Sequence, residues 1–395
     1  MNAARSFTFG RNWKNFLRFY TPERQKVAQD ALLGFLKLPD LKEKTFLDIG
    51  CGSGLHSAAA FLSGASRIVS FDYDPDSVAA TRKLREHLGS PEHWSVMQGS
   101  ALDEEFMKLL GAFDIVYSWG VLHHTGDQWR ALGNACKTMH EMSRLYIALY
   151  AKELQVPNCE YWIDVKKRYN ASGRIGKLLM EADYIWKWQL DRDWRKIPAL
   201  IKKIGTYRFE RGMEFMTDIR DWLGGWPMEF SSTPEVMDFV KNHFGLALVN
   251  FGFGEACSEY LFVHEEKADI LGYKDAALFQ KFHALPQLED VKTPFDRPVW
   301  LFGAAQGAAL IYEHLREQGV AVAGFIDIVP QKQFLHNLPV CSFAAFVKDQ
   351  PKTTPVIQTT RYVVENLRRL HEAGFQTVYD ATRLVKRLNA KREIA

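Results

Sequence analysis

The feature that most constrains the fold is an alternation of short apolar runs and longer helical stretches between residues 45 and 150. The apolar runs have the length and composition of strands, and the segments between them have helical character. Strands alternating with helices predict a parallel sheet that is covered by helices on both faces, which is an α/β fold. The predicted strands span residues 45–50, 67–72, 94–99, 113–118 and 144–150.

A glycine-rich loop, LDIGCGSG, lies between the first predicted strand and the helix that follows. Its glycines, Gly50, Gly52 and Gly54, allow the backbone to approach a ligand closely, and the start of the helix offers free N–H groups. Asp72 ends the next strand, where a carboxylate can accept hydrogen bonds from both hydroxyls of a ribose. Asp48 precedes the loop and suits the ammonium group of an amino acid. Together these residues predict a ligand with ribose, adenine, ammonium and sulfonium groups, which is S-adenosylmethionine.

A dinucleotide-binding enzyme would share the glycine loop and the ribose-binding acid. Dinucleotide sites prefer the spacing G-x-G-x-x-G, whereas this loop has G-x-G-x-G. An acid at position 48 would also oppose the charge of a pyrophosphate. A two-site oxidoreductase stays an alternative, and titration with NAD(H) tests it.

Residues 45 to 150 resemble a class I S-adenosylmethionine-dependent methyltransferase. The glycine motif is LDIGCGSG, the ribose acid lies in SFDYDPDSV, and the adenine segment is Gly99-Ser100-Ala101, where the family usually has Asp in the middle. The fourth motif, FDIVYSWGVLHHTGD, is of the type seen in small-molecule methyltransferases. The resemblance implies a Rossmann-like sheet and a set of cofactor contacts. It also implies an N-terminal lid over the cofactor that contains Trp13. The alternative is that Trp13 lies in a plain amphipathic helix. The cofactor residues implied are Asp48, Gly50, Cys51, Gly52, Gly54, Asp72, Tyr73, Gly99, Ser100, Ala101, Ser118, Trp119 and Trp13.

A histidine pair, His123-His124, follows the strand that ends in Ser118-Trp119. In this architecture the carboxyl end of that strand points at the transferred methyl group. Transfer to an oxygen needs a proton acceptor, and an imidazole is suited to that role near neutral pH. We therefore predict that one of the two histidines is the general base. The alternative is that both cap the next helix or bind backbone, and because adjacent histidines rarely face the same way, we expect no metal site.

Residues 151–230 interrupt the alternation and are rich in Trp, Lys, Arg and Asp. Their pattern predicts a helical cap over the sheet. Charged side chains beside tryptophans and a glycine pair suit the recognition of a polar, ring-shaped substrate such as a sugar. The alternative is a solvated helix followed by a turn. The candidates in this segment are Asp218 and Asp221 for catalysis and Arg220, Trp222 and Trp226 for the substrate.

The first domain is predicted to span residues 1–265. Thr233-Pro234-Glu235 opens a helix, with Thr as its cap and Pro in its first turn. The apolar runs at 246–253 and 259–265 then predict an antiparallel hairpin that completes the same sheet.

We expect a linker over residues 266–296 and a second, smaller Rossmann-like α/β domain over 297–395. LFGAAQGAAL lies between a strand and a helix, and Asp327 ends the next strand. This part resembles the nucleotide-sugar-binding Rossmann-like domain of bacterial sugar acyltransferases, which implies a nucleotide sugar as ligand. Ala305 and Ala308 stand where a dinucleotide site would have Gly, so a degenerate or interaction domain is the alternative.

The composition limits which cellular compartment and which classes of partner are expected. The net charge is +3, which excludes a strongly polybasic nucleic-acid binder. The five cysteines are scattered without a CxxC pair, which favours a reduced, cytoplasmic protein with no zinc ribbon. No apolar run approaches the ~18 residues that a membrane helix needs, so we expect no membrane partner.

These observations predict a methyltransferase that uses S-adenosylmethionine to methylate a hydroxyl of a small molecule or saccharide. The sequence lacks the Asn/Asp-Pro-Pro-Tyr/Phe signature of amino-base methylation. With the low net charge, this disfavours a nucleic-acid substrate. The alternatives are a protein or RNA methyltransferase and a non-catalytic scaffold that binds the cofactor or a nucleotide sugar.

Overall fold

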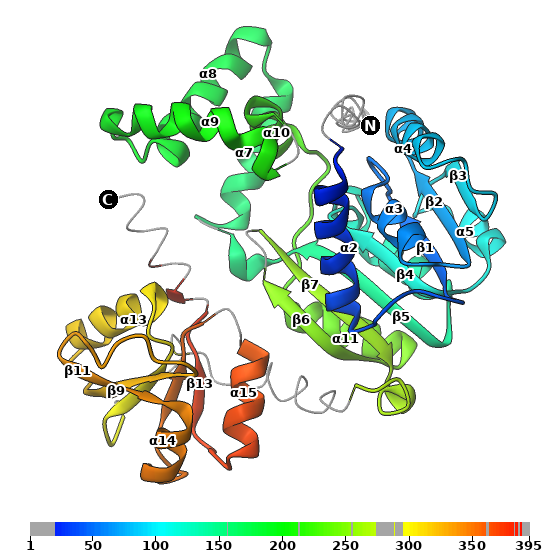
Figure 1. Cartoon of the computed structure of the whole chain (residues 1–395). Helices are drawn as coiled ribbons and strands as arrows, with labels where there is room; N and C mark the ends of the chain where they lie inside the picture. Colours follow the sequence, from blue (N-terminus) through cyan, green and yellow to red (C-terminus); the bar gives the residue numbers. More distant parts are fainter. Residues whose placement is uncertain are drawn as a thin grey trace. The chain divides into compact units, whose positions relative to one another are not determined.

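A computed structural model describes most of the chain in two units, Met1–Tyr273 and Lys274–Ala395, which are treated separately below (Figure 1). The described residues are 20–155, 157–211, 214–253, 256–273, 288, 295–360, 363–382, 384, 385 and 388.

The described part of the first unit carries a seven-stranded sheet in the order β3-β2-β1-β4-β5-β7-β6. Strands β1 to β5 pair in parallel, and β7 pairs antiparallel with β5 and β6. The parallel-dominated sheet confirms the predicted Rossmann-like α/β class. The strands are β1 (Thr45–Ile49), β2 (Arg67–Asp72), β3 (Trp94–Gln98), β4 (Phe113–Trp119), β5 (Met139–Tyr150), β6 (Leu246–Phe253) and β7 (Cys257–His264).

Several helices of this unit begin at a polar side chain that caps them. Asp74 accepts a hydrogen bond from the backbone N–H of Asp76 and so caps α4. The cap of α11 is Ser232 and not the predicted Thr233, because Ser232 and Glu235 form a reciprocal capping box. The helices around the sheet are α2 (Pro22–Leu36), α3 (Leu55–Leu62), α4 (Pro75–His87), α5 (Glu104–Leu110), α6 (Gln128–Cys136) and α11 (Thr233–Phe244), with short helices η2 (Leu122–His124), η3 (Lys152–Leu154) and η6 (Glu265–Lys267).

A helical insertion lies between β5 and α11 and forms a group of its own outside the sheet (Figure 1, green). Its core is aromatic: the Trp162 ring lies 4.9 Å from the Trp222 ring and 5.4 Å from the Trp188 ring. The insertion consists of α7 (Cys159–Ala171), α8 (Arg174–Tyr184), η4 (Ile185–Gln189), η5 (Trp194–Lys196), α9 (Ile197–Arg211) and α10 (Phe215–Gly224).

The two ends of the insertion meet at the sheet. Ala151 and Ser231 form an isolated parallel bridge. The N–H of Ser231 donates to the carbonyl of Tyr150 at 3.1 Å, and the N–H of Lys152 donates to the carbonyl of Ser231 at 3.0 Å. The chain therefore leaves the sheet and returns to it at one point.

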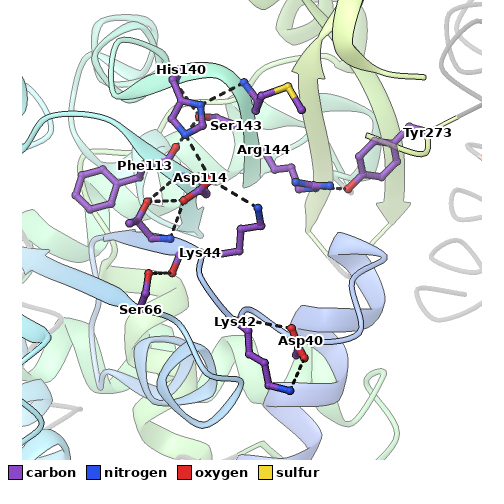
Figure 2. Close-up of polar contacts among 12 residues, drawn as sticks. Asp40, Lys42, Lys44, Ser66, Phe113, Asp114, His140, Ser143, Arg144 and Tyr273 are labelled. Atoms are coloured by element: carbon purple, nitrogen blue, oxygen red, sulfur yellow. Dashed lines mark hydrogen bonds and ion pairs between the residues drawn. The ribbon is translucent and has the colours of Figure 1, made fainter. Parts of the chain in front are cut away.

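Polar contacts close the amino edge of the sheet, where β1 and β4 begin (Figure 2). Asp114 accepts hydrogen bonds from the backbone N–H and the hydroxyl of Thr45, both at 2.9 Å. The same carboxylate lies 3.6 Å from His140 Nε2 and 3.9 Å from Lys44 Nζ. These contacts occupy the edge opposite the carboxyl ends of the strands, so the carboxyl edge is the one left for a ligand.

Residues that follow β7 also pack on the first unit. The hydroxyl of Tyr273 donates to the carbonyl of Leu36 at 2.6 Å and accepts from Arg144 Nε at 2.7 Å (Figure 2). Tyr273 itself is buried. The first compact unit accordingly extends to Tyr273, past the predicted domain end at residue 265.

The second unit is a smaller α/β fold of its own. Its described residues carry a six-stranded sheet in the order β10-β11-β9-β8-β12-β13, parallel except for the β10–β11 pair. Its strands are β8 (Val299–Phe302), β9 (Val322–Asp327), β10 (Phe334–Leu335), β11 (Leu338–Ser342), β12 (Val356–Gln358) and β13 (Val378–Asp380), and its helices are α13 (Gln306–Glu317), α14 (Phe343–Asp349) and α15 (Val363–Glu372). Across both units, no helix in the described ranges is long and apolar enough to cross a membrane.

Candidate functional site

The glycine loop between β1 and α3 adopts a backbone that only glycine tolerates well. Gly50 and Gly54 have φ values of 75° and 81°, in the left-handed region. A Cβ on Gly50 would lie 2.4 Å from Val121 Cγ1, and one on Gly54 would lie 2.8 Å from Thr81 Cγ2. The loop therefore needs glycine both for its turn and for its close packing, and its Gly54 end starts α3 with no side-chain cap.

Asp72 is tied to this loop at the carboxyl end of β2. Its Oδ2 accepts from the N–H of Gly52 at 3.0 Å, and its Oδ1 accepts from the N–H of Asp74 at 2.9 Å. Burial raises the pKa of Asp72 even though these hydrogen bonds favour the charged form. Because each carboxylate oxygen has a second lone pair, Asp72 keeps acceptor capacity for a pair of hydroxyls.

Asp48 lies in β1 beside the glycine loop and is 2% exposed. It accepts a hydrogen bond from the hydroxyl of Ser57, which also bonds Ser70 at 2.6 Å. Ser70 accepts in turn from Trp94 Nε1 at 2.8 Å, so a chain of hydrogen bonds joins the core to the loop. Burial raises the pKa of Asp48 to about 7.

The raised pKa of Asp48 predicts that the unliganded protein loses stability as the pH rises. Between about pH 4 and about pH 7 the folded protein keeps a proton on Asp48 that the unfolded chain releases. The free energy of unfolding should therefore fall with rising pH in this window, and Asp48→Asn should flatten the profile. Urea unfolding of both proteins across the window checks this. Parallel profiles would mean that Asp48 does not titrate there.

The residues after β3 lie next to Asp72, as the sequence motif implies. The N–H of Gly99 donates to the carbonyl of Asp72 at 3.0 Å. The hydroxyl of Ser100 accepts from the N–H of Leu102 at 3.2 Å, and the carbonyl of Ala101 accepts from Asn134 Nδ2 at 2.9 Å. The segment is thus fixed at the edge where an adenine would follow the ribose.

The remaining cofactor candidates differ in exposure. Tyr73 is 70% exposed, whereas Cys51 is buried and its Sγ accepts from the hydroxyl of Thr81 at 3.3 Å. Trp13 lies outside the described residues. In β4, the hydroxyl of Ser118 donates to the carbonyl of Ile49 at 3.0 Å and so ties β4 to the start of the glycine loop.

Trp119 contacts Glu259, which Tyr146 also contacts, and the sequence singled out neither Glu259 nor Tyr146. Trp119 Nε1 donates to Glu259 Oε1 at 3.2 Å, and the hydroxyl of Tyr146 donates to Glu259 Oε2 at 2.7 Å. Tyr117, beside Tyr146, has a buried hydroxyl without a hydrogen-bond partner among the described residues. A pattern search misses Glu259 because it lies in a late strand, far from the motifs.

The two histidines of η2 present different faces of the imidazole. His123 Nδ1 accepts from the N–H of Tyr150 at 3.2 Å, so the proton of its neutral ring is on Nε2. His124 Nδ1 lies 2.7 Å from the carbonyl of Pro227, and since a carbonyl only accepts, this nitrogen carries the proton and Nε2 has the lone pair. Burial lowers the pKa of His124 to about 3 and that of His123 well below its ordinary value, so both rings are neutral at pH 7.

Some of the site residues predicted in the insertion lie near the histidine pair in the structure. The ring of Tyr150 lies 4.0 Å from the ring of His123 and 5.8 Å from that of Trp222, which joins η2 to α10. Asp218 and Asp221 also raise the pKa of Tyr150, after burial and Cys257, and so belong to the same neighbourhood.

Asp218, Arg220 and Trp226 also make contacts within the insertion. Asp218 accepts a hydrogen bond from the hydroxyl of Tyr207. Arg220 binds Glu181 through two nitrogens, at 3.1 and 3.2 Å. The ring of Trp226 lies 5.6 Å from the ammonium of Lys167. The guanidinium of Arg220 is thus engaged in an ion pair inside the insertion.

Lys166 is the residue of this neighbourhood that the sequence did not indicate. It is 0% exposed, donates to the carbonyl of Trp222 and lies 4.7 Å from the centre of the Trp222 ring. Among the residues that the structure describes, no group of three or more His, Cys, Asp or Glu side chains could hold a metal ion.

Comparisons with known proteins agree with the geometry of the first unit. Residues 40–203 match a family model described as a methyltransferase domain. The tRNA U34 carboxymethyltransferase of Shewanella putrefaciens is 38% identical over 84 residues, which cover 21% of this chain and 24% of the relative. The ribosomal protein L11 methyltransferase of a Psychrobacter species is 39% identical over 83 residues, 21% of this chain and 26% of the relative. The chain therefore spans about a quarter of the length of these curated relatives.

Solved structures are similar at low sequence identity. The magnesium protoporphyrin IX methyltransferase of Synechocystis, solved with its cofactor bound, has 13% identity and a TM-score of 0.36 over 61% of this chain and 79% of its own.

The family match covers the glycine loop, Asp72 and the histidine pair. Residues 40–203 are thus similar to a methyltransferase domain, and the matched stretch contains the glycine loop and Asp72.

Proposed function

We propose that the chain transfers a methyl group from S-adenosylmethionine to a hydroxyl of a small molecule or saccharide. The observation that best supports this cofactor is the hydrogen bond from the N–H of Gly52 to the carboxylate of Asp72, which links the glycine loop to that acid. The surroundings of the histidine pair are aromatic. They suit methyl transfer to a small acceptor, because the sulfonium loses its charge during transfer and does not need a polar environment.

The proposed step is an in-line displacement at the methyl carbon. The acceptor oxygen forms a bond to carbon while the carbon–sulfur bond breaks, and its electron pair leaves with the now neutral sulfur. The hydroxyl proton moves to Nε2 of His124, which has the lone pair, whereas Nε2 of His123 carries a proton and serves as a donor. One positive charge is lost at sulfur as one is gained at imidazole, so the site keeps its net charge. The enzyme's main contribution is alignment of the three atoms.

The assay that tests this function uses radiolabelled S-adenosylmethionine with a panel of sugars, nucleotide sugars and phenols. We expect label to enter at least one hydroxyl compound, and His124→Gln to slow that transfer by about 10²-fold to 10⁴-fold because general-base help is lost. Cofactor affinity should be unchanged in His124→Gln, and the exposed His243→Gln serves as the control. Label in tRNA or in a ribosomal protein alone would support the alternative acceptors, and binding of NAD(H) in place of the cofactor would overturn the proposal.

For the second unit we propose the nucleotide-sugar binding that its resemblance implies. Gly303, with φ of 124°, follows β8, and Asp327 ends the neighbouring β9. Asp327 Oδ1 accepts from the N–H of Val329 at 3.1 Å. Calorimetric titration with a uridine nucleotide sugar tests this proposal: Asp327→Ala should abolish the binding, and an unchanged affinity would contradict the role of Asp327.

A further inference from the structure

The ammonium group of Lys166 is buried, and no counter-ion pairs with it among the residues that the structure describes. Lys166 is 0% exposed, and its polar contacts are the carbonyl and the ring of Trp222. No carboxylate among the described residues lies within ion-pair distance of it; Asp221 acts on it only as a more distant charge. A buried cation is normally paired, because removing it from water costs several kcal/mol. Its isolation indicates that an anion completes the site.

The groups around Lys166 do not supply that anion. On η2, His123 and His124 are neutral near pH 7, and the charge of Lys166 contributes to keeping their pKa values low. On α10, Asp221 raises the pKa of Lys166, but burial outweighs it and lowers that pKa to about 7. On β5, Tyr150 stays un-ionised, since burial raises its pKa well above the ordinary value.

Two more hydrogen-bond donors beside Lys166 have no acceptor within the described ranges of the chain. His123 is 0% exposed, and its Nε2, which carries the proton, has no hydrogen-bond partner in the described part of the chain. Trp222 Nε1 is also buried and unpartnered there. Both rings contact the ring of Tyr150. Buried donors without acceptors cost free energy, so such a set indicates a ligand that brings acceptor oxygens.

We propose that Lys166, with the N–H groups of His123 and Trp222, binds an anionic group of the methyl acceptor, a carboxylate or a phosphate. The inference rests on the proposed function and narrows its substrate class to acidic or phosphorylated hydroxyl compounds. The set comprises one cation and two N–H donors, which match the oxygens of a carboxylate or phosphate. The surrounding aromatic rings of Tyr150 and Trp222 exclude water and strengthen the attraction between ammonium and anion.

Calorimetry on the full chain tests the proposal with three probes, namely glucuronate, inorganic phosphate and neutral glucose, each in the presence of S-adenosylhomocysteine. We expect at least one anion to bind more tightly than glucose, and Lys166→Met to weaken that anion about 10-fold to 100-fold. Lys167→Met is the matched control, because Lys167 is the next residue of α7 but is exposed. Preference for glucuronate or for phosphate identifies which anion the acceptor carries. Equal affinity of wild type and Lys166→Met for every anion would overturn the proposal.

Two further readouts separate binding from a structural role of Lys166. Glucuronate stays ionised above pH 5, so its affinity should fall about tenfold per pH unit above about pH 7, as Lys166 loses its proton. Removing an unpaired buried charge should leave the melting temperature of unliganded Lys166→Met equal or higher, whereas loss of a structural contact would lower it. If S-adenosylhomocysteine itself fails to bind wild type, the proposed function fails; if it binds and the anions do not, only the present proposal fails.

Discussion

Asp72→Ala is expected to weaken the binding of S-adenosylmethionine about 100-fold. The carboxylate has the capacity to accept from both ribose hydroxyls while it holds the glycine loop through the N–H of Gly52. Hydrogen bonds to a charged group contribute about 1.5–3 kcal/mol each, and every 1.4 kcal/mol is tenfold in affinity. Losing two of them therefore gives at least that factor, before any disorder of the loop is counted. Calorimetric titration with the cofactor measures the change.

Asp103→Ala is the matched control for Asp72→Ala. Asp103 also accepts a hydrogen bond from a backbone N–H, that of Phe106 at 3.1 Å, but it caps α5 and is exposed. This variant should bind the cofactor as wild type does, with a loss of about 1 kcal/mol in stability from the missing cap. An affinity that stays within threefold of wild type in Asp72→Ala would contradict the ribose role and with it the cofactor assignment.

Trp94→Ala is expected to lower the free energy of unfolding by about 3–5 kcal/mol, the usual cost of truncating a large buried aromatic side chain. Trp94 is 0% exposed, and its Nε1 donates to the hydroxyl of Ser70. Truncation removes apolar contacts and leaves a cavity, and it also takes away a donor from the chain that runs through Ser57 to Asp48. Urea unfolding followed by far-UV circular dichroism measures the loss.

Trp194→Ala provides the comparison for the same substitution at a tryptophan that is 70% exposed. Its cost should stay within about 0.5 kcal/mol, as for ordinary surface positions. Equal unfolding midpoints for Trp94→Ala and wild type would show that the side chain is dispensable to the core, in conflict with its complete burial.

Several strands could be predicted from the sequence because each is a short, largely apolar run. The predicted bounds of β2 and β6, 67–72 and 246–253, agree with the structure. The prediction for β5 began at residue 144, whereas the strand begins at Met139. Its first residues include His140 and Glu141, whose polarity hides a strand that pairing with β4 nevertheless forms.

The candidate site was predictable only where local motifs carry it. The glycine loop, Asp72 and the histidine pair are each recognisable in a short window of sequence. Lys166 is not, because it stands in a Lys-Lys-Arg run that resembles a solvated helix face. Only the packing of α7 against α10 buries it, and a tertiary contact of that kind leaves no local signal.

The bridge between Ala151 and Ser231 has a consequence for how a chain with this fold can diversify. Because both ends of the helical insertion are fastened at one point of the sheet, the segment between them is a closed excursion of the chain. Changes in its length or composition need not shift the strands that carry the glycine loop and Asp72. The sheet with its glycine loop and the helical insertion are thereby structurally separate parts of one unit, and the insertion can vary while the sheet is kept.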